Sequence, residues 1–169
     1  ITAASASKPY KYNKGYSLGA KAKGKLTYKS SNSKVVAISS NGSYYIKGIG
    51  TAKITISAAS TSQYGTAKKT VTITVYPATN TFTKYSSPSR QTIKLAWKKD
   101  TKVTGYELQL STNSKFTSAK VARANRNQIT TTIRGLKSGK KYYVRIRSYK
   151  QIGASKNYGK WSRIKGITV

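Results

Sequence analysis

Apolar and polar residues alternate with a period of two through most of this chain, which is the pattern of half-buried β-strands. In Thr70–Val75 the aliphatic residues fall on one face and the threonines on the other. Lys53–Ser57 shows the same alternation, and so does Thr92–Lys99, where Trp97 shares a face with two aliphatic residues. No segment holds a convincing 3.6-residue period, so the chain is predicted to be all-β.

Asn41-Gly42 separates two of these predicted strands, Val35–Ser39 and Tyr44–Lys47. This dipeptide is the preferred pair for a two-residue type I′ hairpin, because both central residues of that turn need a positive φ. Many short strands separated by such turns are typical of a β-sandwich or barrel.

The alternating pattern breaks at Pro77, directly after the predicted strand that ends in Val75-Tyr76. Proline cannot donate a hydrogen bond to a sheet ladder, and the four residues that follow it show no pattern. A chain of 169 residues is long enough for two small domains. We therefore expect one domain at residues 1–77 and another at residues 78–169.

The charge of the chain is strongly unbalanced. Thirty-three lysines and arginines oppose two acids, Asp100 and Glu107, which gives a formal net charge of +31. The part before Pro77 contributes +12 and the remainder +19, so the charge belongs to the whole surface. Such a chain repels itself, and an anionic partner would offset that cost.

The missing residue types exclude whole classes of function. The chain has no His and no Cys, and it has almost no carboxylate. General acid–base catalysis usually needs a pair of titratable groups with opposed pKa shifts, and metal sites need several oxygen, nitrogen or sulfur ligands. We therefore expect a protein that is not an enzyme, with no catalytic residue, no metal and no cofactor. The longest aliphatic run, Val35–Ile38, is too short to cross a bilayer, so no membrane insertion is expected.

The first part of the chain resembles the bacterial immunoglobulin-like domain of group 2, the BIg2 family, over roughly residues 1–77. The resemblance rests on three elements that occur in the order of that family. They are Leu26–Asn32 with Tyr28-Lys29-Ser30-Ser31-Asn32, the valine pair before Asn41-Gly42, and Gly48–Ile56 with Gly50-Thr51-Ala52-Lys53-Ile54. The Lys- and Tyr-rich stretch before Tyr28 departs from the family pattern.

The second part resembles a fibronectin type III domain over roughly residues 80–169. Trp97 stands at the end of the second predicted strand, where that family keeps its core tryptophan, and Leu136–Arg147 matches the most recognisable segment of the family. The resemblance implies that Tyr142 is the tyrosine-corner residue, whose hydroxyl bonds the backbone upstream. Ser138 stands where the family often has Pro.

Together the resemblances imply two consecutive Ig-like antiparallel β-sandwiches in an extracellular setting, and they imply no activity. Both folds serve as spacers, adhesin stalks, accessory modules of secreted carbohydrate-active enzymes and binding domains, so the fold does not choose among these roles. Surface proteins of Gram-positive bacteria commonly avoid Cys. Because the chain begins at Ile1 without a visible signal peptide, we expect a piece of a longer secreted or cell-surface protein.

The predicted strand around Tyr142 offers a candidate binding strip. If Tyr142 points inward, Tyr143, Arg145, Arg147 and Tyr149 share the outer face. This face is expected to meet Glu107 on one neighbouring strand and Trp161 near the start of the other, so that guanidinium planes stack with Trp161. Glu107 is expected to form an exposed ion pair across the sheet, and Asp100, the other acid, is expected to accept its own backbone amides in a turn. Trp161-Ser162 partly resembles the motif of cytokine-receptor members of the fold, which have such ladders. A self-satisfied ladder that stiffens the sheet is favoured over a ligand-binding strip, because it uses the same donors.

Two further segments combine aromatic and basic residues. Near the N-terminus, residues 8–16 interleave lysines with Tyr10, Tyr12 and Tyr16, which suits a polyanion because lysine neutralises charge while tyrosine stacks on sugars or bases. An irregular first strand whose tyrosines cover the edge of the core is the favoured alternative. Residues 150–160 form a predicted basic loop that offers Tyr158, and a recognition loop and a plain solvated hairpin remain equal alternatives.

The sequence favours a non-catalytic extracellular module that acts in adhesion, spacing or retention at a polyanionic surface. The expected partner is an anionic cell-wall polymer, such as teichoic acid, or an acidic polysaccharide. Nucleic acid is expected to bind only non-specifically, because no helix-based or RNA-sheet motif is present. The alternative is a carbohydrate-binding module of a glycan-degrading enzyme, with the exposed tyrosines and Trp161 as sugar platforms. As a fragment the chain is expected to be monomeric.

Overall fold

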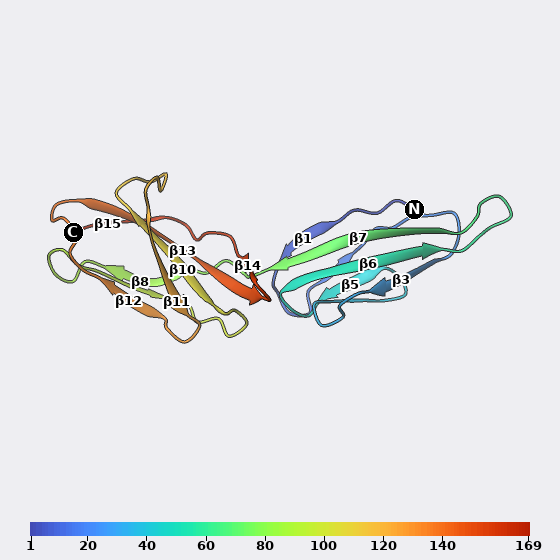
Figure 1. Cartoon of the computed structure of the whole chain (residues 1–169), viewed down its shortest axis with the longest axis horizontal. Coiled ribbons are helices and arrows are strands. Elements are labelled where there is room, and N and C mark those ends of the chain that lie inside the picture. Colours follow the sequence, from blue (N-terminus) through green and yellow to red (C-terminus); the bar gives the residue numbers. More distant parts are fainter. The chain divides into compact units, whose positions relative to one another are not determined.

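The computed structural model describes all residues from 1 to 169, and it consists of strands joined by turns and loops (Figure 1). This confirms the prediction of an all-β chain. No helix is long and apolar enough to cross a membrane. The chain divides into two compact units, Ile1–Tyr76 and Pro77–Val169.

The first unit is built from two sheets. The four-stranded sheet has the order β1 (Ala6–Pro9), β7 (Ala67–Tyr76), β6 (Gly50–Ala58), β3 (Leu26–Ser30). The three-stranded sheet has the order β2 (Gly15–Ser17), β5 (Ser43–Ile46), β4 (Val36–Ile38). The long strands β6 and β7 lie side by side in the middle of the larger sheet (Figure 1).

The pairing of β1 departs from the expected antiparallel pattern. β1 runs parallel to β7, with Lys8 opposite Val75, whereas every other strand pair in this unit is antiparallel. Parallel strands need a long connection, and almost the whole unit lies between these two strands. The alternation of apolar residues in β1 carries no information about the direction of its partner, so the sequence could not predict this pair.

The alternating apolar side chains of the strands form the core of the first unit. Ile54 and Ile56 of β6 and Ile73 of β7 are completely buried, together with Val36 and Ile46 of the smaller sheet. The intervening threonines and lysines of β6 and β7 are exposed or half-buried. The predicted faces of these strands are therefore confirmed.

The hairpin between β4 and β5 forms as expected, but its turn differs from the predicted type I′. The turn closes with a hydrogen bond from Gly42 N to Ser39 O (3.0 Å), and Gly42 has a positive φ of 80° whereas Asn41 does not. Asn41 instead accepts a hydrogen bond from Ser43 N on its Oδ1 (2.9 Å). The connection has four residues and not two, which favours an ordinary turn followed by one left-handed residue.

The second unit also contains two sheets. One has the order β11 (Lys120–Asn125), β10 (Gly105–Ser111), β13 (Lys141–Ile152), β14 (Ser155–Tyr158), and β15 (Lys165–Thr168) pairs with the first part of β13. The other has the order β12 (Thr130–Ile133), β9 (Ile93–Trp97), β8 (Phe82–Ser86). The predicted loop at residues 150–160 is largely a hairpin, because β13 continues to Ile152 and β14 returns beside it after a turn at Gly153.

The core of the second unit centres on Trp97 and Tyr106. Their rings meet edge to face at 5.6 Å, and both side chains are buried. The Tyr142 hydroxyl accepts a hydrogen bond from Lys137 N at 2.9 Å. This is the tyrosine corner that the sequence resemblance implied, and it ties the start of β13 to the loop before it.

Candidate functional site

The outer face of the five-stranded sheet carries most of the candidate residues of the second unit. In β13, Tyr142, Val144 and Ile146 are buried, whereas Arg145 and Arg147 point to the other side. The antiparallel register places Glu107 of β10 opposite Arg147. The predicted parity of both strands is therefore confirmed.

Glu107 lies at the centre of this face and accepts hydrogen bonds from three side chains. Arg147 donates to Oε1 from Nε (3.0 Å) and from Nη2 (2.6 Å), and Arg123 of β11 donates to Oε2 from Nε (3.1 Å) and Nη2 (2.9 Å). The Tyr158 hydroxyl adds a bond to Oε2 at 3.3 Å. Glu107 is only 3% exposed. The expectation of an exposed surface pair was therefore wrong, because the two arginines and Tyr158 cover the carboxylate.

Trp161 lies between two arginines of β13. The guanidinium carbons of Arg145 and Arg147 are 4.4 and 4.3 Å from the centre of its ring. Residues two apart on one face of a strand are separated by about 7 Å. The Trp161 ring therefore contacts two neighbouring arginines of one strand face at once.

The stack continues beyond both arginines. Arg145 also lies over the ring of Phe116 at 4.1 Å, and Arg147 lies over the ring of Tyr158 at 3.8 Å. We call these five residues, Phe116, Arg145, Trp161, Arg147 and Tyr158, the cation–aromatic ladder. Its rungs come from a loop, from β13, from the segment before β15 and from β14. The ladder thus connects the loop with Phe116, the segment with Trp161 and β14 to the outer face of β13.

The two arginines of β13 differ in their electrostatic surroundings. Burial raises the pKa of Glu107, but the hydrogen bonds and charges of Arg147 and Arg123 outweigh it and hold that pKa below its usual value. Desolvation, followed by the positive charge of Arg147, lowers the pKa of Arg145. Arg145 donates from Nε to the neutral Gln109 Oε1 at 2.8 Å and has no carboxylate partner. The single acid on this face therefore forms ion pairs with Arg147 and Arg123 but not with Arg145.

Tyr143 and Tyr149 flank the ladder along β13. Lys141 lies 5.7 Å from the ring of Tyr143. The ring centres of Tyr149 and Tyr158 are 5.9 Å apart, and Lys156 Nζ lies over the Tyr149 ring, 5.2 Å from its centre. Its hydroxyl comes within 2.9 Å of the place where a Cβ on Gly105 would stand, so only glycine leaves room for it there. Each of these tyrosines is half-buried and already contacts a cation.

The N-terminal tyrosines differ in burial and in the partners that they contact. Tyr16 stacks on buried Tyr44 with ring centres 5.5 Å apart, and Lys8 Nζ lies over the Tyr16 ring, 4.7 Å from its centre. Tyr10 is half-buried and donates its backbone N–H to Tyr76 O. Tyr12 is 66% exposed and lies 5.3 Å from Lys47 Nζ. Tyr12 and Tyr16 thus contact different lysines.

Sequence reasoning missed two residues of the site, Arg123 and Phe116. Arg123 is opposite Glu107 on the side away from Arg147, in the register of β10 with β11. An arginine at an outward position of a neighbouring strand could have suggested this pair. Phe116 has a positive φ of 59° in the loop between β10 and β11, and no sequence pattern predicts that a loop aromatic folds back over a strand.

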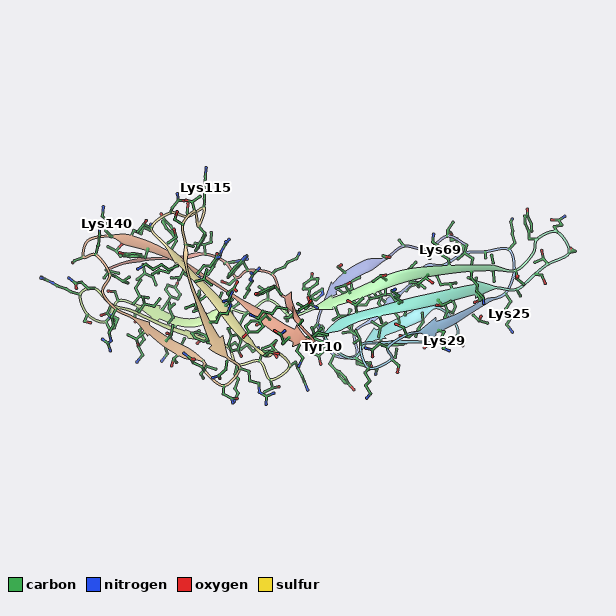
Figure 2. All side chains as sticks on the ribbon, viewed as in Figure 1. Tyr10, Lys25, Lys29, Lys69, Lys115 and Lys140 are labelled. Carbon is green, nitrogen blue, oxygen red and sulfur yellow. The ribbon has the colours of Figure 1, made fainter.

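The surface outside the ladder is dominated by lysine. Figure 2 shows labelled lysines on both units, among them Lys29 of β3 and Lys69 of β7, and Lys115 at the tip of the loop between β10 and β11. Asp100 keeps its negative charge, but it is one of only two acids against thirty-three basic residues, and its Oδ1 accepts a hydrogen bond from Lys102 N within its own turn (2.8 Å). The predicted turn role of Asp100 is therefore confirmed.

The fold and the ladder define an Ig-like β-sandwich of the fibronectin class. The fibronectin type III domain family matches residues 76–164, which is more than half of the chain. The chain therefore belongs to the fibronectin type III family. Domains of this family are typically non-catalytic modules of multidomain proteins, and they are common in extracellular proteins.

A solved structure of two fibronectin type III domains shows the same fold. The chain is similar to a segment of two fibronectin type III domains from chicken tenascin, with 15% identity and a TM-score of 0.56 over 85% of this chain and 82% of that one. It also matches the FN1–FN3 domains of chicken CNTN1, with 13% identity and a TM-score of 0.47 over 98% and 62% of the two chains. A third match is the fn3 domain of human contactin 1, with 14% identity and a TM-score of 0.43 over 50% and 72%. No curated protein matches the sequence.

Proposed function

We propose that this chain is a non-catalytic extracellular module that holds a larger protein at a polyanionic surface. The surface would be a cell-wall polymer or an acidic polysaccharide, and binding would act over the whole face of each unit. In this proposal residues 1–77 form a BIg2 domain, residues 78–169 form the fibronectin type III domain, and the parent is a surface or secreted protein of a Gram-positive bacterium.

One observation carries the proposal, namely that the two acids neutralise very little of the outer surface. Glu107 is covered and shared between two arginines, and Asp100 is a single carboxylate in a unit with twenty-one basic residues. The first unit has twelve lysines and no acid at all. An anionic polymer that follows such a surface releases its counterions, and this release drives association.

The geometry gives less support to the alternative of a carbohydrate-binding module. A sugar platform needs an open aromatic face, whereas the guanidinium groups of Arg145 and Arg147 both lie over the ring of Trp161. Arg147 also covers a face of Tyr158. A stiffening role for the ladder accounts for these contacts without a ligand.

Retention on immobilised pectin, heparin or teichoic acid at rising NaCl tests the proposal. We expect binding to weaken linearly in a plot of log affinity against log salt, and to vanish well below about 1 M NaCl. Two matched variants probe whether the charge acts diffusely. One changes six lysines of the first unit to Gln: Lys11, Lys14, Lys21, Lys25, Lys29 and Lys69. The other changes six lysines of the second unit to Gln: Lys84, Lys94, Lys98, Lys99, Lys102 and Lys160.

Both variants should elute earlier by similar amounts, because each loses the same charge from exposed positions. Retention that persists in molar salt would argue against a diffuse surface. Complete loss of retention in one variant with no change in the other would also contradict the proposal.

A further inference from the structure

An open pocket lies at one end of the second unit, away from the centre of the ladder. It is bounded by the loop between β10 and β11 and by the turn before β13, and its volume is about 430 Å³. This lies within the range of small-ligand pockets, roughly 300–1,000 Å³. Leu110, Leu136 and Tyr142 supply an apolar lining.

Three lysines line the pocket and no acid does. Lys120, Lys137 and Lys140 come from β11 and from the turn before β13, and none of them has an ion-pair partner. Figure 2 shows Lys140 at this end of the second unit. The pocket therefore favours a ligand that carries negative charge.

Hydroxyl groups complete the lining. Thr112, Thr117 and Ser118 line this pocket, are exposed, and have hydroxyl groups that make no hydrogen bond within the protein. The Tyr142 hydroxyl accepts a bond from Lys137 N, and its own proton has no acceptor in the protein. Such hydroxyls both donate and accept, which suits the hydroxyl groups of a sugar ring.

The wall of the pocket is held in an uncommon conformation. Phe116 and Ser118 have positive φ angles of 59° and 53°, which are uncommon for residues other than glycine. Phe116 is buried against the guanidinium of Arg145, so the end of the ladder anchors the loop that carries Thr117 and Ser118. Residues other than glycine with such backbone angles occur more often at ligand-binding sites than elsewhere.

From this geometry we infer that the pocket binds one uronate unit of an acidic polysaccharide. The lysines pair with its carboxylate, and the unbonded hydroxyls meet its ring hydroxyls. The inference rests on the proposed function, because it names the unit that the polyanion presents, but it adds a local site to the diffuse surface.

The test is a titration of the ¹⁵N-labelled chain with trigalacturonate at 150 mM NaCl, followed by NMR. A trimer is too short to exploit the whole surface, and its methyl ester is a matched ligand with the same rings and no charge. The pocket variant changes Lys120, Lys137 and Lys140 to Gln. The control variant changes Lys84, Lys94 and Lys98 to Gln, which removes the same charge from exposed positions outside the pocket.

We expect saturable shifts of the amides of Thr112, Thr117 and Ser118, with binding weakened about tenfold or more in the pocket variant and less than about twofold in the control. The methyl ester should bind at least about tenfold more weakly than the acid. Shifts spread over the chain, or equal losses in both variants, would overturn the site. If polymer retention persists while these local shifts are missing, only the pocket assignment fails; if polymer retention is missing at low salt, the proposed function fails as well.

Discussion

Arg147 and Glu107 lie directly opposite each other on β13 and β10, and Arg147 donates two hydrogen bonds to the same carboxylate oxygen, at 3.0 and 2.6 Å. The other oxygen of Glu107 receives Arg123 from the strand on its far side. One carboxylate thus joins three neighbouring strands. Removal of this carboxylate would leave Arg123 and Arg147 close to Arg145 without the negative charge that offsets their repulsion.

Glu107→Gln should therefore cost more stability than an exposed ion pair. We expect the free energy of unfolding of the second unit to fall by about 1–3 kcal/mol, less than for a fully buried pair because both arginines remain partly exposed. Tryptophan fluorescence during urea unfolding measures this, since both tryptophans belong to that unit. Asp100→Asn is the control, because the amide keeps the acceptor for Lys102 N. A loss as small as that of the control would show that the covered pair contributes no more than a surface pair.

The stability of the second unit should depend on pH through Glu107. Because the pKa of Glu107 is lowered in the folded state, the contribution is complete above the ordinary value of 4.5 and is lost as pH falls through the lower, folded value. The melting temperature should thus decline below about pH 4.5 and stay level above it, with no His to titrate near neutrality. Glu107→Gln should flatten most of this decline. An undiminished decline in the variant would assign it to another group.

Trp161→Ala should lower the stability of the second unit. The substitution removes the ring that separates Arg145 from Arg147, and with it two cation–aromatic contacts. We expect a loss of about 1–3 kcal/mol, from contacts of about 0.5–1 kcal/mol each and from lost apolar burial. Thermal unfolding followed by circular dichroism measures it, and retention on a neutral glycan column is measured in parallel.

Tyr12→Ala provides the control for that experiment, because Tyr12 is exposed and contacts a single lysine. It should change the melting temperature little. Should Trp161→Ala instead keep its stability and lose neutral-glycan binding, the carbohydrate-binding module would replace the stiffening role.

Gly42→Ala should destabilise the hairpin of the first unit. Gly42 has a φ of 80°, and a Cβ there would stand 2.9 Å from the Tyr28 hydroxyl. We expect a loss of about 2–3 kcal/mol, in which the left-handed backbone contributes roughly 1–2 kcal/mol and the displacement of Tyr28 the rest. Gly19→Ala is the matched control, because Gly19 has a φ of 63° and open space around its Cβ position. Equal losses in urea unfolding would mean that Tyr28 moves aside without cost.

Alternation along the chain was enough to predict which side chains of β6, β7, β9 and β13 are buried. Side chains point to opposite faces at every step of a strand, so local sequence alone determines the parity. Parity also placed Arg145 and Arg147 on the face opposite Tyr142, but the neighbouring segments with Glu107 and Trp161 came from the family resemblance. Trp97 and Tyr142 followed from the family resemblance, because their surroundings are set by the fold.

Other features depend on contacts between distant segments, which no local pattern contains. Register between β10 and β11 brings Arg123 to Glu107, and the burial of that carboxylate results from three side chains that reach it from separate strands. The path of a loop with positive φ angles places Phe116 on Arg145 and opens the lysine-lined pocket beside it. β1 pairs in parallel with β7 because the whole first unit folds between them. Parity is a property of one strand, whereas register, loop path and strand direction are decided only when the segments pack together.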